Sequence, residues 1–337
     1  MITYVATRKY ILIQWAAVLG LCAACVDVMA QPAWKPERSV EIVVGSSPGG
    51  GTDITARLLQ KIMQDRRLID SAIVVNKPGG GQTVAWAYLN QHSGNGHYVS
   101  IVNEPLITNR IMGVSALSYR NFTPLGLLFK EYVVFLVRPD STLKTGVELA
   151  ELLKKDAGGL SFGQGSSRGN NAHTTIGLLG MATGDGLKNQ KMVVFKSGGE
   201  ALAALQGGHI DVGVSTIAAA IQHIKAGRVR ALATTSEKRL SGDLASTPTW
   251  KEQGFDVVYG SWRVLFGPHG MSRMQMAFWE DVLNKVSQAE EWKAALVQNQ
   301  QENAYLSAEE TRKFLDAEEA RLTPLFADLG LAKPAQK

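Results

Sequence analysis

Short apolar runs alternate with amphipathic stretches along most of the chain. Short apolar runs predict buried β-strands, and apolar positions three or four residues apart predict helices that bury one face. The predicted strands cover residues 40–44, 72–75, 98–102, 125–129, 132–137, 160–162, 192–195, 211–214 and 229–233, and two further runs in 257–266. The predicted helices cover residues 52–62, 82–91, 143–155, 170–182, 200–206 and 216–226, and the tail 271–329 is expected to be helical throughout. Alternating strands and helices indicate an α/β fold with mostly parallel sheets flanked by helices.

The first strand leads into the loop Gly45–Gly51, which contains three consecutive glycines. Thr52 is the expected N-cap of the following helix. The helix is expected to bury Ile54, Leu58, Leu59 and Ile62. Glycines leave the backbone N–H groups accessible, and the start of a helix adds unpaired N–H groups and positive potential. Such a place suits an anion, so we expect a carboxylate-binding site here.

The same succession of strand, glycine loop and helix occurs four times, with loops at 49–51, 79–81, 163–169 and 198–199. Ligands of open α/β sheets bind at the carboxyl ends of the strands. The four loops are therefore expected to face one cleft, between two blocks of the chain that form a clamp.

Nucleotide and metal chemistry fit the sequence poorly. Gly51 is followed by Thr-Asp without the lysine of a P-loop. The run Gly163-Gln164-Gly165 begins a dinucleotide motif, but Gly169 comes one position too late. His92 and His97 flank a polar turn rather than forming a ligand pair. We therefore expect no cofactor and no metal site.

An exported serine hydrolase is an alternative, because Gly45–Gly49 and Gly165–Gly169 both match the nucleophile-elbow pattern. The first match fails because Pro48 has no N–H for an oxyanion hole. The second would use Ser167 as the nucleophile, with Asp211 or Asp256 and His269. No loop carries a concentrated pair of carboxylates, which favours binding over catalysis. His173, one turn into the following helix, could reach the cleft or fix the loop.

The N-terminus has the pattern of a secretory signal. Arg8 and Lys9 precede the apolar run 10–24, and the small residues of 28–30 predict cleavage after Ala30. The signal peptide would cover residues 1–30 and direct the protein to export. Cys25 follows two alanines, as in lipoprotein signals, but the residues before it match that motif poorly, so lipid anchoring is not preferred.

Composition supports an exported globular protein. Its 337 residues predict two domains, and 45% hydrophobic with 19% charged residues is ordinary for a soluble chain. The formal charge of +5 is scattered, so nucleic acid is not an expected partner. Both cysteines, Cys22 and Cys25, lie in the predicted leader, so the mature chain is expected to contain no disulfide.

Several motifs in order resemble the solute-binding proteins of tripartite tricarboxylate transporters, the Bug family. These motifs are Pro48–Asp53, Asn76–Gly80, Phe195–Gly199, Gln206–Asp211 and His223–Ala233. The resemblance implies a type II periplasmic binding protein, or Venus flytrap. One lobe would comprise 31–130 and 256–337 and the other 131–255. The lobes would close by hinge motion near 129–132 and 257–261, with Trp262 on the cleft wall.

The resemblance also implies a small organic carboxylate held by backbone amides and waters. The corresponding positions are Ser47, Gly49, Gly50, Gly51 and Thr52 in the first lobe, and Gly165, Ser166, Ser167, Asn171 and His173 in the second. Residues 45–47 replace a bulkier, aromatic segment of the family, and the loop 162–173 is a residue longer than usual. The chain would be a monomer that delivers its ligand to the transporter's membrane subunits and has no enzymatic activity. A ligand sensor for a signalling receptor is a second alternative.

Overall fold

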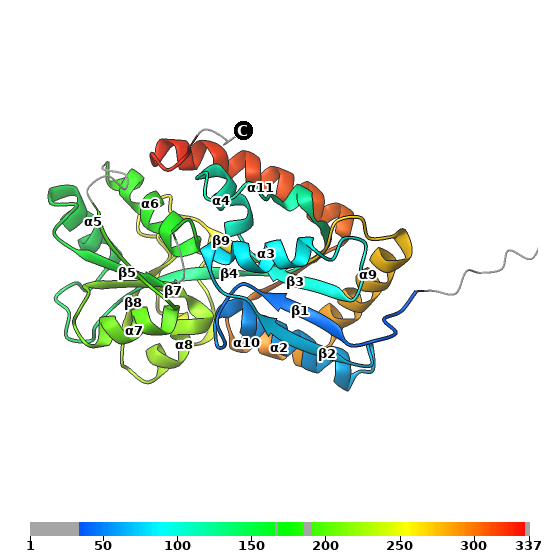
Figure 1. Ribbon diagram of the computed structural model, residues 1–337. Coiled ribbons are helices and arrows are strands. Elements are labelled where there is room, and N and C mark those ends of the chain that lie inside the picture. Colours follow the sequence, from blue (N-terminus) through cyan, green and yellow to red (C-terminus); the bar gives the residue numbers. More distant parts are fainter. Residues whose placement is uncertain (1–33, 166–167, 185–189, 334–337) are drawn as a thin grey trace, which may run out of the picture. The chain divides into compact units, whose positions relative to one another are not determined.

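The computed structural model describes residues 34–165, 168–184 and 190–333 (Figure 1). The compact unit that carries the fold spans Lys35–Lys337 and is considered by itself. The predicted signal peptide, Ser166 and Ser167 lie outside the described residues. None of the helices within the described ranges has the length and apolarity needed to cross a membrane.

The centre of the fold is a mixed β-sheet. Its main path runs β2-β1-β3-β9-β4-β7-β5-β6, and β8 and β10 also pair with β4. The strands are β1 (Val40–Val44), β2 (Ala72–Asn76), β3 (Tyr98–Val102), β4 (Thr123–Val137), β5 (Ser161–Gly165), β6 (Lys191–Phe195), β7 (Val212–Thr216), β8 (Arg230–Thr234), β9 (Gly260–Gly267) and β10 (Glu302–Leu306). β1 pairs in parallel with β2 and β3, and β5 pairs in parallel with β6 and β7. Every pairing of β4 and of β9 is antiparallel. The α/β class is confirmed.

Helices cover the sheet. They are α2 (Gly51–Asp65), α3 (Thr83–Asn90), α4 (Pro105–Ile111), α5 (Gly146–Lys155), α6 (Asn171–Thr183), α7 (Gly198–Gln206), α8 (Ile217–Lys225), α9 (Arg273–Gln288), α10 (Glu290–Gln298) and α11 (Ala308–Asp328). Near the parallel strands β1, β2 and β3, α2 packs with α9 and α10, and α4 packs with α11 (Figure 1). Near the parallel strands β5, β6 and β7, α5 packs with α6, and α7 packs with α8.

The prediction that the tail is helical throughout is wrong, because β10 lies between α10 and α11. β10 contains no β-branched residue, so its sequence carries little strand propensity. Its strand structure comes from antiparallel pairing with β4, where Asn303 lies opposite Phe129. Tertiary pairing therefore overrides the local preference.

The two apolar runs predicted at 125–129 and 132–137 form one strand, β4, of 15 residues. Lys130 and Glu131 interrupt the apolar pattern, yet Glu131 is buried because it forms an ion pair with Arg263 of β9. Residues 129–132 pair with residues 260–263. The segment 129–132 and the end of 257–261, both predicted as hinges, are thus neighbours in one antiparallel ribbon. Hinge motion itself stays a prediction, as do the residue bounds of the two lobes.

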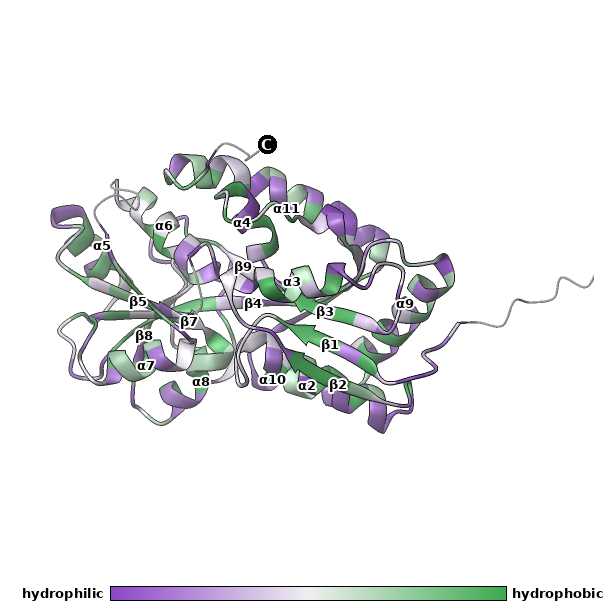
Figure 2. Ribbon diagram, in the orientation of Figure 1, coloured by the Kyte–Doolittle hydropathy of each residue, from purple (hydrophilic) through white to green (hydrophobic). Residues whose placement is uncertain are grey.

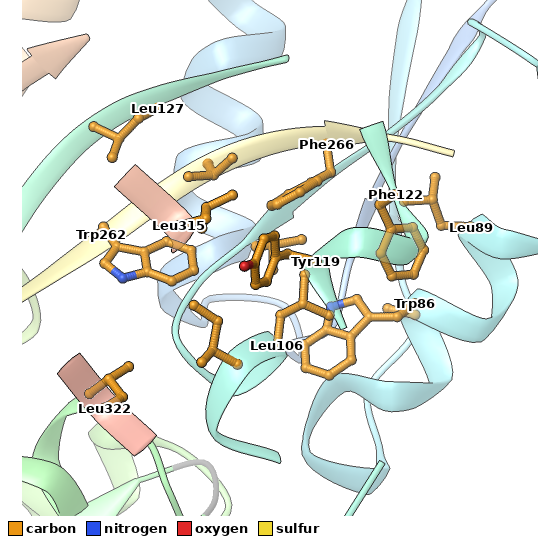
Figure 3. Close-up of a cluster of buried hydrophobic side chains, with 14 of the residues drawn as sticks. Trp86, Leu89, Leu106, Tyr119, Phe122, Leu127, Trp262, Phe266, Leu315 and Leu322 are labelled. Atoms are coloured by element: carbon orange, nitrogen blue, oxygen red, sulfur yellow. The ribbon is translucent and has the colours of Figure 1, made fainter. Parts of the chain in front are cut away.

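Buried apolar side chains of the described residues form one cluster that includes residues of β1, β3, β4 and β9, and two further clusters that include residues of β4. Figure 2 shows hydrophobic residues concentrated on β1, β2 and β3. Figure 3 shows the core beside them, where residues of α3, α4, β9 and α11 meet. Trp262 belongs to this core and donates from Nε1 to Oε2 of Glu318 at 3.2 Å. The expectation that Trp262 forms a cleft wall is therefore wrong, since its ring is enclosed by other side chains.

Candidate ligand-binding site

Asp53, in the first turn of α2, holds the first glycine loop in place. Its buried carboxylate accepts hydrogen bonds from Gly49 N (2.9 Å), Asn76 Nδ2 (2.8 Å) and Arg57 Nε (2.9 Å). Asn76 also donates to the carbonyl of Ser46 at 3.0 Å. Burial raises the pKa of Asp53, but hydrogen bonds from Arg57, Asn76 and Gly49 outweigh it and lower the pKa below its usual value. Asp53 is ionised and fixes the first glycine loop through these hydrogen bonds; it is not an acid catalyst.

The start of α2 has no side-chain cap. The N-cap is Gly50, so the prediction that Thr52 fills this position is wrong. Thr52 is the second helical residue, and its hydroxyl donates to Ser46 Oγ at 2.7 Å. The N–H groups of Gly51, Thr52 and Asp53 have no intrahelical acceptor, and none of the described residues accepts from them. Three donors at the positive end of a helix are therefore available to an anion.

The apolar face predicted for α2 is partly wrong. Ile54 is 56% exposed, because its side chain points away from the sheet in the first turn. Leu59 and Ile62 are buried as predicted, together with Ala56 and Met63, and Leu58 is half-buried. Ser47, Gly49 and Gly51 are exposed, so the loop that carries the free donors faces solvent.

The loop before α6 has a different character. β5 extends to Gly165, so residues 163–165 belong to the strand rather than the predicted loop. Asn170 is the N-cap of α6; its Oδ1 accepts from His173 N at 2.9 Å, and its Nδ2 donates to Gly165 O at 2.5 Å. Asn171 Oδ1 accepts from Ala172 N at 2.8 Å. The side chains of Asn170 and Asn171 thus bind the amides at the second and third positions of α6, which correspond to those of Thr52 and Asp53 in α2.

His173 fixes this loop and keeps one free donor. Its Nδ1 accepts from Gly169 N at 2.7 Å, so the proton of the neutral ring is on Nε2. Burial and the nearby charge of Arg168 lower the pKa of His173 to about 4, which keeps the ring neutral. The buried Nε2 has no partner among the described residues. Of the two predicted roles, loop fixation is therefore observed.

Helix α4, which the sequence analysis missed, joins two of the glycine loops. Thr108 donates from Oγ1 to Gly169 O at 2.7 Å, and Asn109 donates from Nδ2 to Gly81 O at 2.9 Å. Both side chains are buried. Pro105 at the first position of α4 was the available signal for this helix.

The remaining loops also lie close together. A Cβ on Gly165 would overlap the backbone of Gly198, and a Cβ on Gly45 would overlap the side chain of Gln82. The structure therefore brings the third and fourth loops together and places Gln82 beside the first loop. Gln82 in turn donates to Asn103 Oδ1 at 2.8 Å, at the end of β3.

Two cavities are found elsewhere on the surface. One of about 380 Å³ is lined by Tyr132 and residues of 236–241 and 297–302, and one of about 490 Å³ by residues of 153–158 and 183–184. Neither is lined by a described residue of the four glycine loops, so a cleft shared by these loops stays a prediction. Within the described ranges, no three His, Cys, Asp or Glu residues are grouped as a metal site.

Asp211, one of the two aspartates predicted for the hydrolase alternative, lies too far from the proposed nucleophile. Asp211 accepts hydrogen bonds from the N–H (2.8 Å) and Oγ (2.6 Å) of Ser161, the first residue of β5. Gly165, at the other end of β5, is about 13 Å away at the usual rise per strand residue. Asp211 therefore cannot assist a nucleophile in the loop that follows Gly165. The carbonyl of His269 accepts from Ser93 and Gly94, beside β3.

This fold defines a two-lobed periplasmic binding protein. A solved structure of the periplasmic binding protein BugD superposes with a TM-score of 0.80 and 25% sequence identity, covering 89% of this chain and 100% of that chain. A model of the family described as "Tripartite tricarboxylate transporter family receptor" matches residues 55–331. The chain belongs to this family.

Curated relatives agree with this assignment. A Cupriavidus necator protein described as "UPF0065 protein in gbd 5'region" is 27% identical over 321 residues, covering 94% of this chain and 95% of its own length. Protein BugT of Bordetella pertussis is 24% identical over 322 residues, which cover 93% of this chain and 97% of its own length. MatC from Rhodopseudomonas palustris, solved with bound malate, shares the fold with a TM-score of 0.76 at 22% identity, covering 86% of this chain and 99% of that chain.

Proposed function

We propose that this chain is a periplasmic receptor that captures a small organic carboxylate and delivers it to the membrane subunits of a tripartite tricarboxylate transporter. The observation that carries this proposal is the set of unpaired N–H groups on Gly51, Thr52 and Asp53. A carboxylate oxygen is a strong acceptor for such donors, and each hydrogen bond to a charged group contributes about 1.5–3 kcal/mol.

The class of ligand is supported by two proteins that share the fold. One is MatC with malate, and the other is an R. palustris protein solved with adipate, at a TM-score of 0.80 and 22% identity. Both of these ligands are dicarboxylates. We extend their chemistry, a small organic acid, to this chain.

In the proposed complex, one carboxylate binds at the first loop and the second lobe closes over the ligand. The first contact set is Ser47, Gly49, Gly50, Gly51 and Thr52, and the second is Gly165, Ser166, Ser167, Asn171 and His173. The buried Nε2–H of His173 is the donor of the second set that best suits an acceptor on the ligand. The lobes comprise 31–130 with 256–337, and 131–255, and the protein acts as a monomer without catalysis.

The direct test is a thermal-shift screen of the purified protein with mono-, di- and tricarboxylates, each paired with its methyl ester. A ligand at 100 times its Kd stabilises the native state by about 2.7 kcal/mol, so a true ligand raises the melting temperature. The proposal expects the acids to raise it and the esters to leave it unchanged. If no acid raises it, or esters act equally, carboxylate capture is wrong.

Delivery is tested separately, by uptake of the identified acid into cells that lack this chain. Loss of uptake, restored by the wild-type gene, supports transport. Normal uptake in the deletion strain would contradict delivery and favour the role of a ligand sensor.

A further inference from the structure

Arg263 lies directly beneath the start of α2. It is in β9, only 4% exposed, and its Nη2 would be 3.3 Å from a Cβ built on Gly51. Gly51 itself is exposed and carries one of the free amides. A buried guanidinium therefore lies next to the helix start, where Gly51 faces solvent.

The guanidinium is only partly satisfied. Its Nη1 donates to Ser261 Oγ and to Trp262 O, each at 3.0 Å, and its Nη2 donates to the carboxylate of Glu131. The Nε–H has no partner among the described residues, although it is buried. An unpaired N–H of a buried charged group is costly, so an acceptor supplied by a ligand would be stabilising.

The charges around Arg263 leave room for one more anion. Glu131 is 2% exposed and also accepts from Gln301 Nε2 at 3.1 Å, so it has a second partner besides Arg263. Glu104 is fully buried and accepts from Trp262 N at 2.8 Å. Burial raises the pKa of Glu104, although Arg263 acts in the opposite direction, which favours the uncharged acid. The ion pair of Arg263 with Glu131 is neutral in sum, and the helix end adds positive potential.

We propose that Arg263 is a specificity-determining residue that binds the ligand carboxylate at the start of α2, together with the backbone amides of Gly51 and Thr52. The ligand carboxylate accepts from the Nε–H of Arg263, which has no partner among the described residues, while Glu131 stays paired with Nη2 and with Gln301 Nε2. This inference rests on the proposed function and adds a charged side chain to a site otherwise built of main-chain donors.

The test compares Arg263→Gln with Glu131→Gln, two variants that break the same ion pair. Affinity for malate and adipate is measured by calorimetry on the purified protein. The loss of one charge-assisted contact predicts that Arg263→Gln binds these acids at least about tenfold more weakly than the wild type. Glu131→Gln removes a negative charge beside the site, so binding is expected to be unchanged or tighter. A merely structural ion pair would weaken binding in both variants alike.

A double variant, Arg263→Gln with Glu131→Gln, guards against misfolding because it replaces the ion pair with a neutral hydrogen-bonding pair. It is expected to bind as weakly as Arg263→Gln. Arg321→Gln, which breaks the pair with Glu318 on α11, is the matched control and should retain affinity. Equal losses in both single variants, or no loss in Arg263→Gln or the double variant, would overturn the inference. If the wild type binds no acid in the wider carboxylate screen, the proposed function itself has failed instead.

Discussion

The two helix starts at α2 and α6 follow similar glycine-rich loops but use their backbone amides differently. At α2 the N-cap is Gly50, and the N–H groups of Gly51, Thr52 and Asp53 have no acceptor among the described residues. At α6 the N-cap is Asn170, and the side chains of Asn170 and Asn171 accept from the first-turn amides. A glycine-rich loop before a helix is therefore not enough to predict an anion site. The side chains at the cap decide whether the amides remain available.

The largest effect is expected from Gly169→Ala, because Gly169 has a left-handed backbone and packs against α4. Gly169 has a φ of +78°, and a Cβ there would overlap the methyl group of Met112 and approach Thr108. Left-handed strain, with a moderate packing cost because Met112 Cε is the end of a flexible side chain, predicts a loss of about 2–3 kcal/mol in the free energy of unfolding. Chemical denaturation measures it. A loss below about 1 kcal/mol would show that the loop can move away from α4.

Asp53→Ala tests the brace of the first loop. It removes the acceptor of Gly49 N, Asn76 Nδ2 and Arg57 Nε. The loss of three hydrogen bonds to a buried carboxylate, whose donors are themselves partly or fully exposed, predicts a loss of about 2 kcal/mol in the free energy of unfolding. Carboxylate binding is expected to weaken as well, because the amides lose their fixed position. Asp65→Asn, at the exposed end of the same helix, is the control and should stay within about 0.5 kcal/mol. Similar losses in both variants would contradict a special role for Asp53.

The pH dependence of stability tests the neutral state of His173. The folded pKa of about 4 lies below the ordinary value of 6.5, so between these values the unfolded chain binds more protons. The stabilisation by neutral His173 is complete above pH 6.5 and is lost as the pH falls toward 4. His173→Gln keeps an acceptor for Gly169 N but does not titrate. The stability difference between wild type and this variant should therefore shrink by about 1.4 kcal/mol per pH unit in this window. A constant difference would refute the neutral, loop-fixing ring.

Gly49→Ala is expected to have the smallest effect. Gly49 has a φ of +79°, almost that of Gly169, but a Cβ there would have no atom within 4 Å. Backbone strain alone predicts a loss of about 1–2 kcal/mol in the free energy of unfolding. The difference from Gly169→Ala then reports packing alone. Equal losses would mean that the two loops are not packed differently.

Elements that are set by local pattern were predictable from the sequence. β1 and β3 match the predicted ranges, because their runs are apolar and rich in β-branched residues. β10 was missed because only its pairing with β4 makes it a strand. The N-cap of α2 was misplaced by two residues, since a glycine cap has no side chain to mark it.

The candidate site was predictable where backbone chemistry decides it and not where distant partners do. The glycines at 49–51 indicated accessible backbone amides at the start of a helix. Arg263 gave no such signal, because its burial depends on Glu131, which is 132 positions away in the chain. Asn76 and Thr108 likewise acquire their roles only through contacts with loops that the fold brings near.

The most direct test of carboxylate binding at the start of α2 is an amide NMR titration with malate or adipate. A carboxylate that accepts from free amides should give the largest amide-proton shifts at Gly51 and Thr52. The amides of Ala172 and His173, already bonded to side chains, should shift much less. Large shifts at the start of α6 with none at α2 would contradict the account.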